Sequence, residues 1–120
     1  MWKKAFGKQG EADAVRYLEG HGLEIVARNW RYGRSELDIV AKQDSILHVI
    51  EVKTRWGDEY TSVEALVRSA QKQRILEGAQ AFMELHGGTA TAIQVDLLVI
   101  ITNPWGTSYE YIPDAIQDSF

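Results

Sequence analysis

Two segments of the chain place apolar residues at the spacing of a helix. Residues 3–20 carry apolar positions three or four residues apart and stop at His21-Gly22. Residues 71–86 repeat this pattern and stop at Gly87-Gly88. Between them, Thr61-Ser62-Val63-Glu64 resembles a capping box. We therefore expect two long helices and one short helical turn.

The other apolar segments are short, rich in β-branched residues and typical of strands. Polar stretches separate them, and we expect loops at residues 31–34 and 54–60 and turns at 42–45 and 103–106. The order helix, three strands, helix, two strands predicts an α/β fold with a mixed central sheet of about five strands flanked by helices. The expected strands are 23–30, 36–41, 46–53, 92–102 and 108–112.

Composition narrows the class of protein. A length of 120 residues suits a single domain over residues 1–120, and 45% apolar with 25% charged residues is ordinary for a globular protein. The absence of cysteine excludes disulfides and thiol catalysis, so any metal must be held by oxygen or imidazole ligands. No signal peptide or membrane span is evident, so we expect a soluble cytoplasmic protein. The net charge of -4 requires a local basic patch if the partner is nucleic acid.

Acidic residues gather on the predicted hairpin of residues 36–53. Alternation places Glu36 with Asp38 on one side of the first strand and Glu51 with Lys53 on one side of the second. A turn at Gln43-Asp44 would make Glu51 a diagonal neighbour of Asp38. A turn at Asp44-Ser45 would set the two acids directly opposite each other. Either register puts all four charged groups on one face.

This concentration of charge is costly, because like charges opposite each other destabilise a strand pair. A hard divalent cation would offset the cost, since Mg²⁺ (or Mn²⁺) is held by one or two carboxylates and substrate phosphate oxygens. We predict Asp38 and Glu51 as metal ligands, with the Lys53 ammonium beside the metal-bound water or the phosphate. In-line phosphodiester hydrolysis is the corresponding chemistry. The alternative is a solvated sheet face with ordinary ion pairs.

The same residues resemble a known signature. Asp38 followed by Glu51-Val52-Lys53 is similar to the PD-(D/E)XK nuclease motif, with Leu37 where that motif has Pro. Over nearly the whole chain the sequence resembles the YraN family of small bacterial proteins, although Ser35 stands where that family usually has Gly. The matching segments are Gly10-Glu11, Arg28-Asn29, Ser35 to Ala41, Ile50 to Arg55, Glu64-Ala65 and Gln94-Val95-Asp96.

That family is similar to archaeal Holliday-junction resolvases and is presumed to be endonuclease-like. The resemblance implies a three-layer, restriction-endonuclease-like α/β fold. It also implies metal ligation by Asp38 and Glu51 and a catalytic role for Lys53. Glu11 would be an added acid near the metal, and Glu36 a neighbouring acid of the catalytic group.

Basic residues near the hairpin and at the start of the second long helix provide cations for phosphates, which partly answers the net-charge objection. Trp30, Tyr32 and Trp56 add rings on which bases could stack. The alternative is that these cations are ordinary solvated side chains and that Trp30 belongs to the core. The candidate nucleic-acid-binding residues are Arg28, Arg31, Arg34, Arg55, Lys72 and Arg74.

Asp96 and the three histidines are assigned structural roles. Asp96 interrupts an apolar strand, and a buried carboxylate needs partners. His21, His48 and His86 have no partner at metal-ligand spacing.

The sequence therefore predicts a metal-dependent endonuclease acting on DNA, with branched or structured DNA among the candidate substrates and a homodimer considered. Two other functions stay open. One is a nucleic-acid-binding protein on a nuclease fold that does not cut. The other is a protein-interaction module that uses an exposed sheet edge or the aromatic residues Trp105, Tyr109 and Tyr111.

Overall fold

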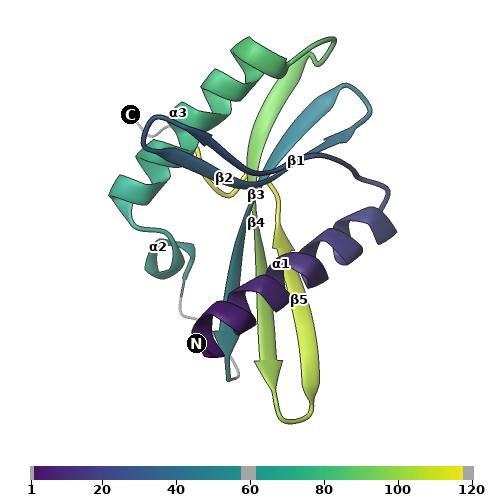
Figure 1. Cartoon of the computed structure of the whole chain (residues 1–120), viewed down its shortest axis with the longest axis vertical. Coiled ribbons are helices and arrows are strands. Elements are labelled where there is room, and N and C mark those ends of the chain that lie inside the picture. The colour runs from purple at the N-terminus through teal and green to yellow at the C-terminus, as the bar shows by residue number, and fades with distance from the viewer. Residues whose placement is uncertain (1, 58–61, 118–120) are drawn as a thin grey trace.

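The computed structural model describes residues 2–57 and 62–117, with side chains described from Gln9 onward. The elements follow the predicted order, with a short helix before the second long one (Figure 1). They are α1 (Trp2–Gly20), β1 (Glu24–Tyr32), β2 (Ser35–Gln43), β3 (Ile46–Trp56), α2 (Val63–Leu66), α3 (Ser69–His86), β4 (Ala92–Asn103) and β5 (Gly106–Ile112).

The five strands form one mixed sheet in the order β1-β2-β3-β4-β5, which confirms the predicted sheet. All neighbours are antiparallel except β3 and β4, which run parallel. Parallel neighbours need a long crossover, and the segment carrying α2 and α3 supplies it. None of the helices in the described chain combines the length and apolar character needed to cross a bilayer.

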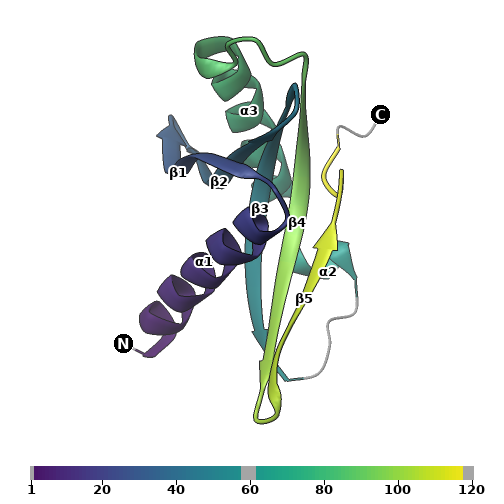
Figure 2. The same cartoon turned by 90° about the vertical axis from the view of Figure 1, so that its right-hand side faces the viewer.

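Helices cover both faces of the sheet, which gives the three layers expected from the resemblance (Figure 2). On one face Ala14 and Leu18 of α1 pack against Ile39, Ile50 and Leu98. On the other face α3 and α2 cover a larger core, which includes Leu47, Val49, Ile75, Phe82 and Leu97. We call these the α1 face and the α3 face.

Two strands extend into segments that the sequence predicts as loops, and β2, β4 and β5 also take in one or two residues of the predicted turns. β3 continues to Trp56, because β4 pairs with it as far as Thr102, so residues 54–56 are not loop. β1 continues to Tyr32 and turns at Gly33-Arg34, where Gly33 has a φ of 58°. In both places hydrogen bonding to a neighbouring strand overrides a polar local sequence. The N-cap of α2 is Ser62, which accepts from Ala65 N–H, and Thr61 lies outside the described residues.

The register of the β2–β3 hairpin selects one of the two predicted alternatives. Ile39 pairs with Ile50, and the turn lies at Asp44-Ser45, with Asp44 at a φ of 57°. Pairing stops at Ile39, and the β1–β2 hairpin then swings across the rest of the sheet (Figure 1). Asp38 is therefore the first residue of β2 beyond the paired ladder.

Candidate functional site

The candidate site begins where β2 separates from β3. Val52 N–H donates to Asp38 Oδ2 at 2.9 Å, so the carboxylate takes the place of a backbone partner. The register sets Asp38 opposite Glu51, whose residue exposure is 6%. The structure thus brings together the two predicted metal ligands.

The environment of Glu51 makes its charged form costly. Burial raises the pKa of Glu51 to about 9, helped by the negative charge of Asp38 and by hydrogen bonding with it. The charge of Glu36 raises this pKa further, whereas the Lys53 ammonium lowers it. The one nearby cation does not compensate for the burial and the neighbouring acids. Without another positive charge, the Glu51 carboxyl is protonated at neutral pH.

Lys53 lies beside Glu51, and a third side chain links the two. Lys53 Nζ is 3.8 Å from Glu51 Oε1 and donates to Gln71 Oε1 at 3.2 Å. Gln71 Nε2 in turn donates to Glu51 Oε1 at 3.4 Å. The Gln71 amide therefore orients both an acid and a cation of the site.

Sequence reasoning missed Gln71. It lies in the first turns of α3, which packs on the same sheet face as Glu51 and Lys53. In the sequence, the one indication of its role is that it is a polar residue next to the apolar face of a predicted helix. That signal does not distinguish Gln71 from Gln73, which is exposed.

The other two predicted acids lie differently. Glu36 is exposed and forms an ion pair with Arg31 at 3.4 Å, while its charge still acts on Glu51. Glu11 is half-buried on α1, the helix of the opposite face. Within the described residues no hydrogen bond or ion pair joins Glu11 to Asp38 or Glu51. A role for Glu11 at the metal stays a prediction.

Three predicted phosphate-binding arginines lie on the β1–β2 hairpin. Arg28, Arg31 and Arg34 are all exposed, with Arg31 partly neutralised by Glu36. This hairpin diverges from β3 at Asp38, so the strands that carry the arginines run away from the rest of the sheet (Figure 1). Exposed arginines of this kind are available to contact anions.

The remaining predicted cations lie on β3 and α3. Arg55 is half-buried, donates to the Thr54 carbonyl at 2.8 Å, and alternates onto the same side of β3 as Lys53. Lys72 is half-buried and Arg74 is exposed, both in the first turns of α3. Ser35 Oγ donates to the Arg74 carbonyl at 2.7 Å. The serine that departs from the family pattern thus ties β2 to α3.

The aromatic residues divide between core and surface. Trp30 packs edge-on against Phe82, with ring centroids 5.1 Å apart. It therefore packs with the core of the α3 face, as the alternative to base stacking predicts. Trp56 is exposed to 68% and is free to contact a ligand. Of the three tail aromatics, Tyr111 is half-buried and Tyr109 stacks on Tyr17, whereas Trp105 is 89% exposed.

Asp96 has the structural role that the sequence predicts. It is fully buried and accepts hydrogen bonds from Gln94 Nε2 at 2.8 Å, from Asp114 N–H at 2.7 Å and from the Tyr111 hydroxyl. His48 Nδ1 lies 2.7 Å from Asp96 Oδ2. These partners satisfy the carboxylate on the α1 face, away from Glu51.

The acid pair fits a hard divalent cation. Asp38 and Glu51 offer carboxylate oxygens, and burial together with the charge of Asp38 raises the pKa of Glu51, an effect that a bound cation would offset. Among the described side chains, no group of three or more His, Asp or Glu is arranged to hold a metal. A cation here would have two protein carboxylates, with the rest of its coordination sphere left for water or substrate oxygens.

Fold and site together define a small α/β protein of restriction-endonuclease-like architecture with paired carboxylates and a lysine on adjacent strands. Comparison with known proteins assigns it more narrowly. The chain belongs to the family described as Uncharacterised protein family UPF0102, which matches residues 10–100.

Relatives in this family match over most of their length. A UPF0102 protein of Christiangramia forsetii is 37% identical over 91% of this chain and 91% of its own. One of Bacteroides thetaiotaomicron is 37% identical over 95% of this chain and 90% of its own. One of Streptomyces coelicolor is 37% identical over 81% of this chain and 76% of its own.

Proposed function

We propose that this protein is a metal-dependent endonuclease that hydrolyses phosphodiester bonds of DNA, with branched or structured DNA among its candidate substrates. One observation carries the proposal: a buried glutamate faces a second carboxylate and lies 3.8 Å from a lysine ammonium. Asp38 accepts from Val52 N–H, but that structural role does not require a buried glutamate opposite it, because an apolar residue at position 51 would pack without the cost of burying charge.

The side chains divide the work of hydrolysis. Asp38 and Glu51 would hold Mg²⁺ or Mn²⁺, which supplies positive charge for a phosphoryl oxygen and for activation of water. The Lys53 ammonium, oriented by Gln71, would stabilise negative charge that develops on the phosphate. Arg55 and the arginines of the β1–β2 hairpin would bind flanking phosphates.

The main rival is a protein that binds nucleic acid on the same fold without cutting it. The net charge of -4 weighs against both functions, because net negative charge opposes contact with phosphates, so it does not decide between them. The two functions differ in one requirement. Binding alone does not need Glu51 to be buried against Asp38, whereas hydrolysis does.

The test is cleavage of junction, flap and duplex DNA by the purified protein with Mg²⁺ or Mn²⁺. We expect the wild type to cut at least one of these substrates. Asp38→Asn and Lys53→Ala should lower the rate by about 100-fold or more, by loss of a metal ligand and of charge stabilisation. Lys42→Ala, which removes a lysine at the far end of β2, is the matched control and should cut normally.

Failure of the wild type to cut any substrate would refute the enzyme proposal. Retained DNA affinity in the same preparation would then favour the binding protein. Equal cleavage by wild type and Lys53→Ala would show that any activity arises elsewhere or from a contaminant.

A further inference from the structure

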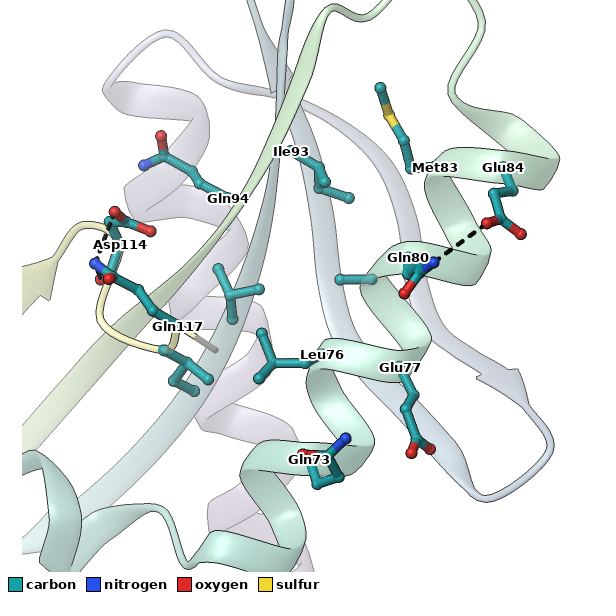
Figure 3. A pocket seen from close by; sticks show the side chains of 13 residues that line it. Gln73, Leu76, Glu77, Gln80, Met83, Glu84, Ile93, Gln94, Asp114 and Gln117 are labelled. Carbon is teal, nitrogen blue, oxygen red and sulfur yellow. Dashed lines mark hydrogen bonds between the residues drawn. The ribbon is translucent and has the colours of Figure 1, made fainter. Parts of the chain in front are cut away.

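A groove with a volume of about 600 Å³ lies between α3, β4 and the segment that follows β5 (Figure 3). None of Asp38, Glu51 and Lys53 lines it, so it is separate from the candidate site. Apolar residues from three parts of the chain line it: Leu76, Ala79 and Met83 from α3, Ile93 and Val95 from β4, and Ile116 beyond β5. Four glutamines also line it, namely Gln73, Gln80, Gln94 and Gln117. Leu76, Met83 and Ile93 are only partly buried, so they offer contact area to a ligand.

The rim of the groove is acidic. Glu77 and Glu84 are exposed two turns apart along α3, and Asp114 is exposed on the other side. Figure 3 shows both glutamates along the helix and Asp114 across the groove from them. No lysine or arginine is among the residues that line it. A polyanion is therefore disfavoured here, and a cationic partner is favoured.

The groove also borders a stretch of the β4 edge that no described strand covers and whose backbone groups are only partly paired. β5 pairs with β4 only from Leu97 onward, so no described strand pairs with residues 92–96 on the side opposite β3. The Val95 carbonyl points to this side and accepts from Ile116 N–H at 3.3 Å. Because alternate residues of a strand point their backbone groups to the same edge, the N–H and C=O of Ile93 face the groove side as well.

We propose that this groove binds an extended, basic segment of a partner protein by strand addition to the edge of β4. The backbone of the segment would pair with Ile93, and an apolar side chain would enter between Leu76 and Met83. Lysine or arginine residues flanking that anchor would lie against Glu77 and Glu84. This binding does not depend on nuclease activity.

The partner reading is favoured over a second copy of this chain. Among the described side chains, three exposed arginines gather on the β1–β2 hairpin, which does not line the groove. Docking that hairpin into the groove would join two different surfaces of the protein. Contacts between unlike surfaces propagate into open chains of molecules unless the geometry closes a ring.

The test uses a fluorescein-labelled synthetic peptide in which two leucines are flanked by lysines. We expect saturable binding at low salt, measured by fluorescence anisotropy. The peptide with glutamate in place of lysine should not bind. The double variant Glu77→Gln/Glu84→Gln should bind the basic peptide roughly fivefold more weakly, because two rim charges are lost. The control Glu19→Gln/Glu64→Gln removes two exposed acids elsewhere and should bind like the wild type.

Two further measurements locate the binding. Methylating alternate peptide nitrogens should weaken binding about tenfold, since strand addition uses backbone hydrogen bonds. Amide exchange at Ile93 should slow in the complex, and Asp38→Asn should leave the affinity unchanged. Equal binding of both peptides would overturn the proposal, as would exchange protection confined to β3. Self-association that Glu77→Gln/Glu84→Gln abolishes would also overturn it, because the occupant would then be a second copy.

Discussion

Replacing Glu51 with glutamine should stabilise the metal-free protein. Glutamine keeps the shape of the side chain, still accepts from Gln71, and carries an amide that can donate to Asp38. It removes the ionisation that burial opposes. Most substitutions of buried residues destabilise a protein, so a gain in stability at a proposed catalytic residue is a sharp expectation.

The magnitude follows from the pKa of Glu51, which is about 9 in the folded protein against 4.5 for an ordinary glutamate. Between these values the folded state holds a proton that the unfolded chain releases, so the free energy of unfolding falls as pH rises. Each pH unit in this window costs about 1.4 kcal/mol, so the loss at pH 8 approaches ~5 kcal/mol. Local relaxation reduces such losses, and we expect Glu51→Gln to gain about 2–5 kcal/mol at that pH.

The assay is urea unfolding followed by circular dichroism, in EDTA, from about pH 5 to about pH 9. The wild type should lose stability steadily across this range, whereas Glu51→Gln should follow a flatter curve. The two proteins should converge toward the acidic end, where the unfolded chain begins to bind the proton that Glu51 holds in the folded state. Glu19→Gln, an exposed acid on α1, should run parallel to the wild type.

Two results would refute this reasoning. One is a wild-type profile that stays flat across the window. The other is a Glu51→Gln protein that is less stable than the wild type at every pH. A third arm examines the proposed cation: Mg²⁺ or Mn²⁺ in place of EDTA should raise the unfolding midpoint of the wild type at about pH 8 but not that of Glu51→Gln.

Three other predictions concern neighbouring features. Gly78→Ala should destabilise the protein by about 1–3 kcal/mol in thermal unfolding, because the added Cβ would lie 2.8 Å from Ser35 Cβ. The control Gly20→Ala, whose Cβ would meet nothing within 4 Å, should be neutral or stabilising. Asp96→Ala should cost about 3–5 kcal/mol, because it leaves its buried hydrogen-bonding partners without an acceptor, and an unchanged unfolding midpoint would contradict this. Gln71→Ala should lower the cleavage rate and the metal affinity by about 10–100-fold while changing stability by less than about 1 kcal/mol; normal values of both would remove Gln71 from the site.

Local pattern was enough to predict the helices and the mixed sheet. The long helix ending at His86 and the hairpin containing Asp38 and Glu51 both carry strong periodicity, and the structure confirms them. The end of β3 could not be read in this way, because residues 54–56 are polar and become strand through pairing with β4. Local sequence does not record such distant hydrogen bonding.

The sequence was enough to predict which site residues share a sheet face, but not which side chains contact one another there. Strand alternation predicts that Glu51 and Lys53 share one side, and the structure places their charged atoms 3.8 Å apart. Choosing between the two hairpin registers required the turn geometry at Asp44. Gln71 lies eighteen residues beyond Lys53 in the chain, so only the packing of α3 on the sheet brings it to the site.

Asp38 lies at the point where the β1–β2 hairpin separates from β3. One of its oxygens holds the Val52 N–H that β2 leaves unpaired, so a single side chain both terminates a ladder and faces Glu51. A sheet that branches at this point therefore favours a hydrogen-bond acceptor at position 38, whether or not the site is catalytic. A relative without the acid would need another group to accept from Val52 N–H, and a serine or asparagine at that position would supply one while keeping the branched sheet.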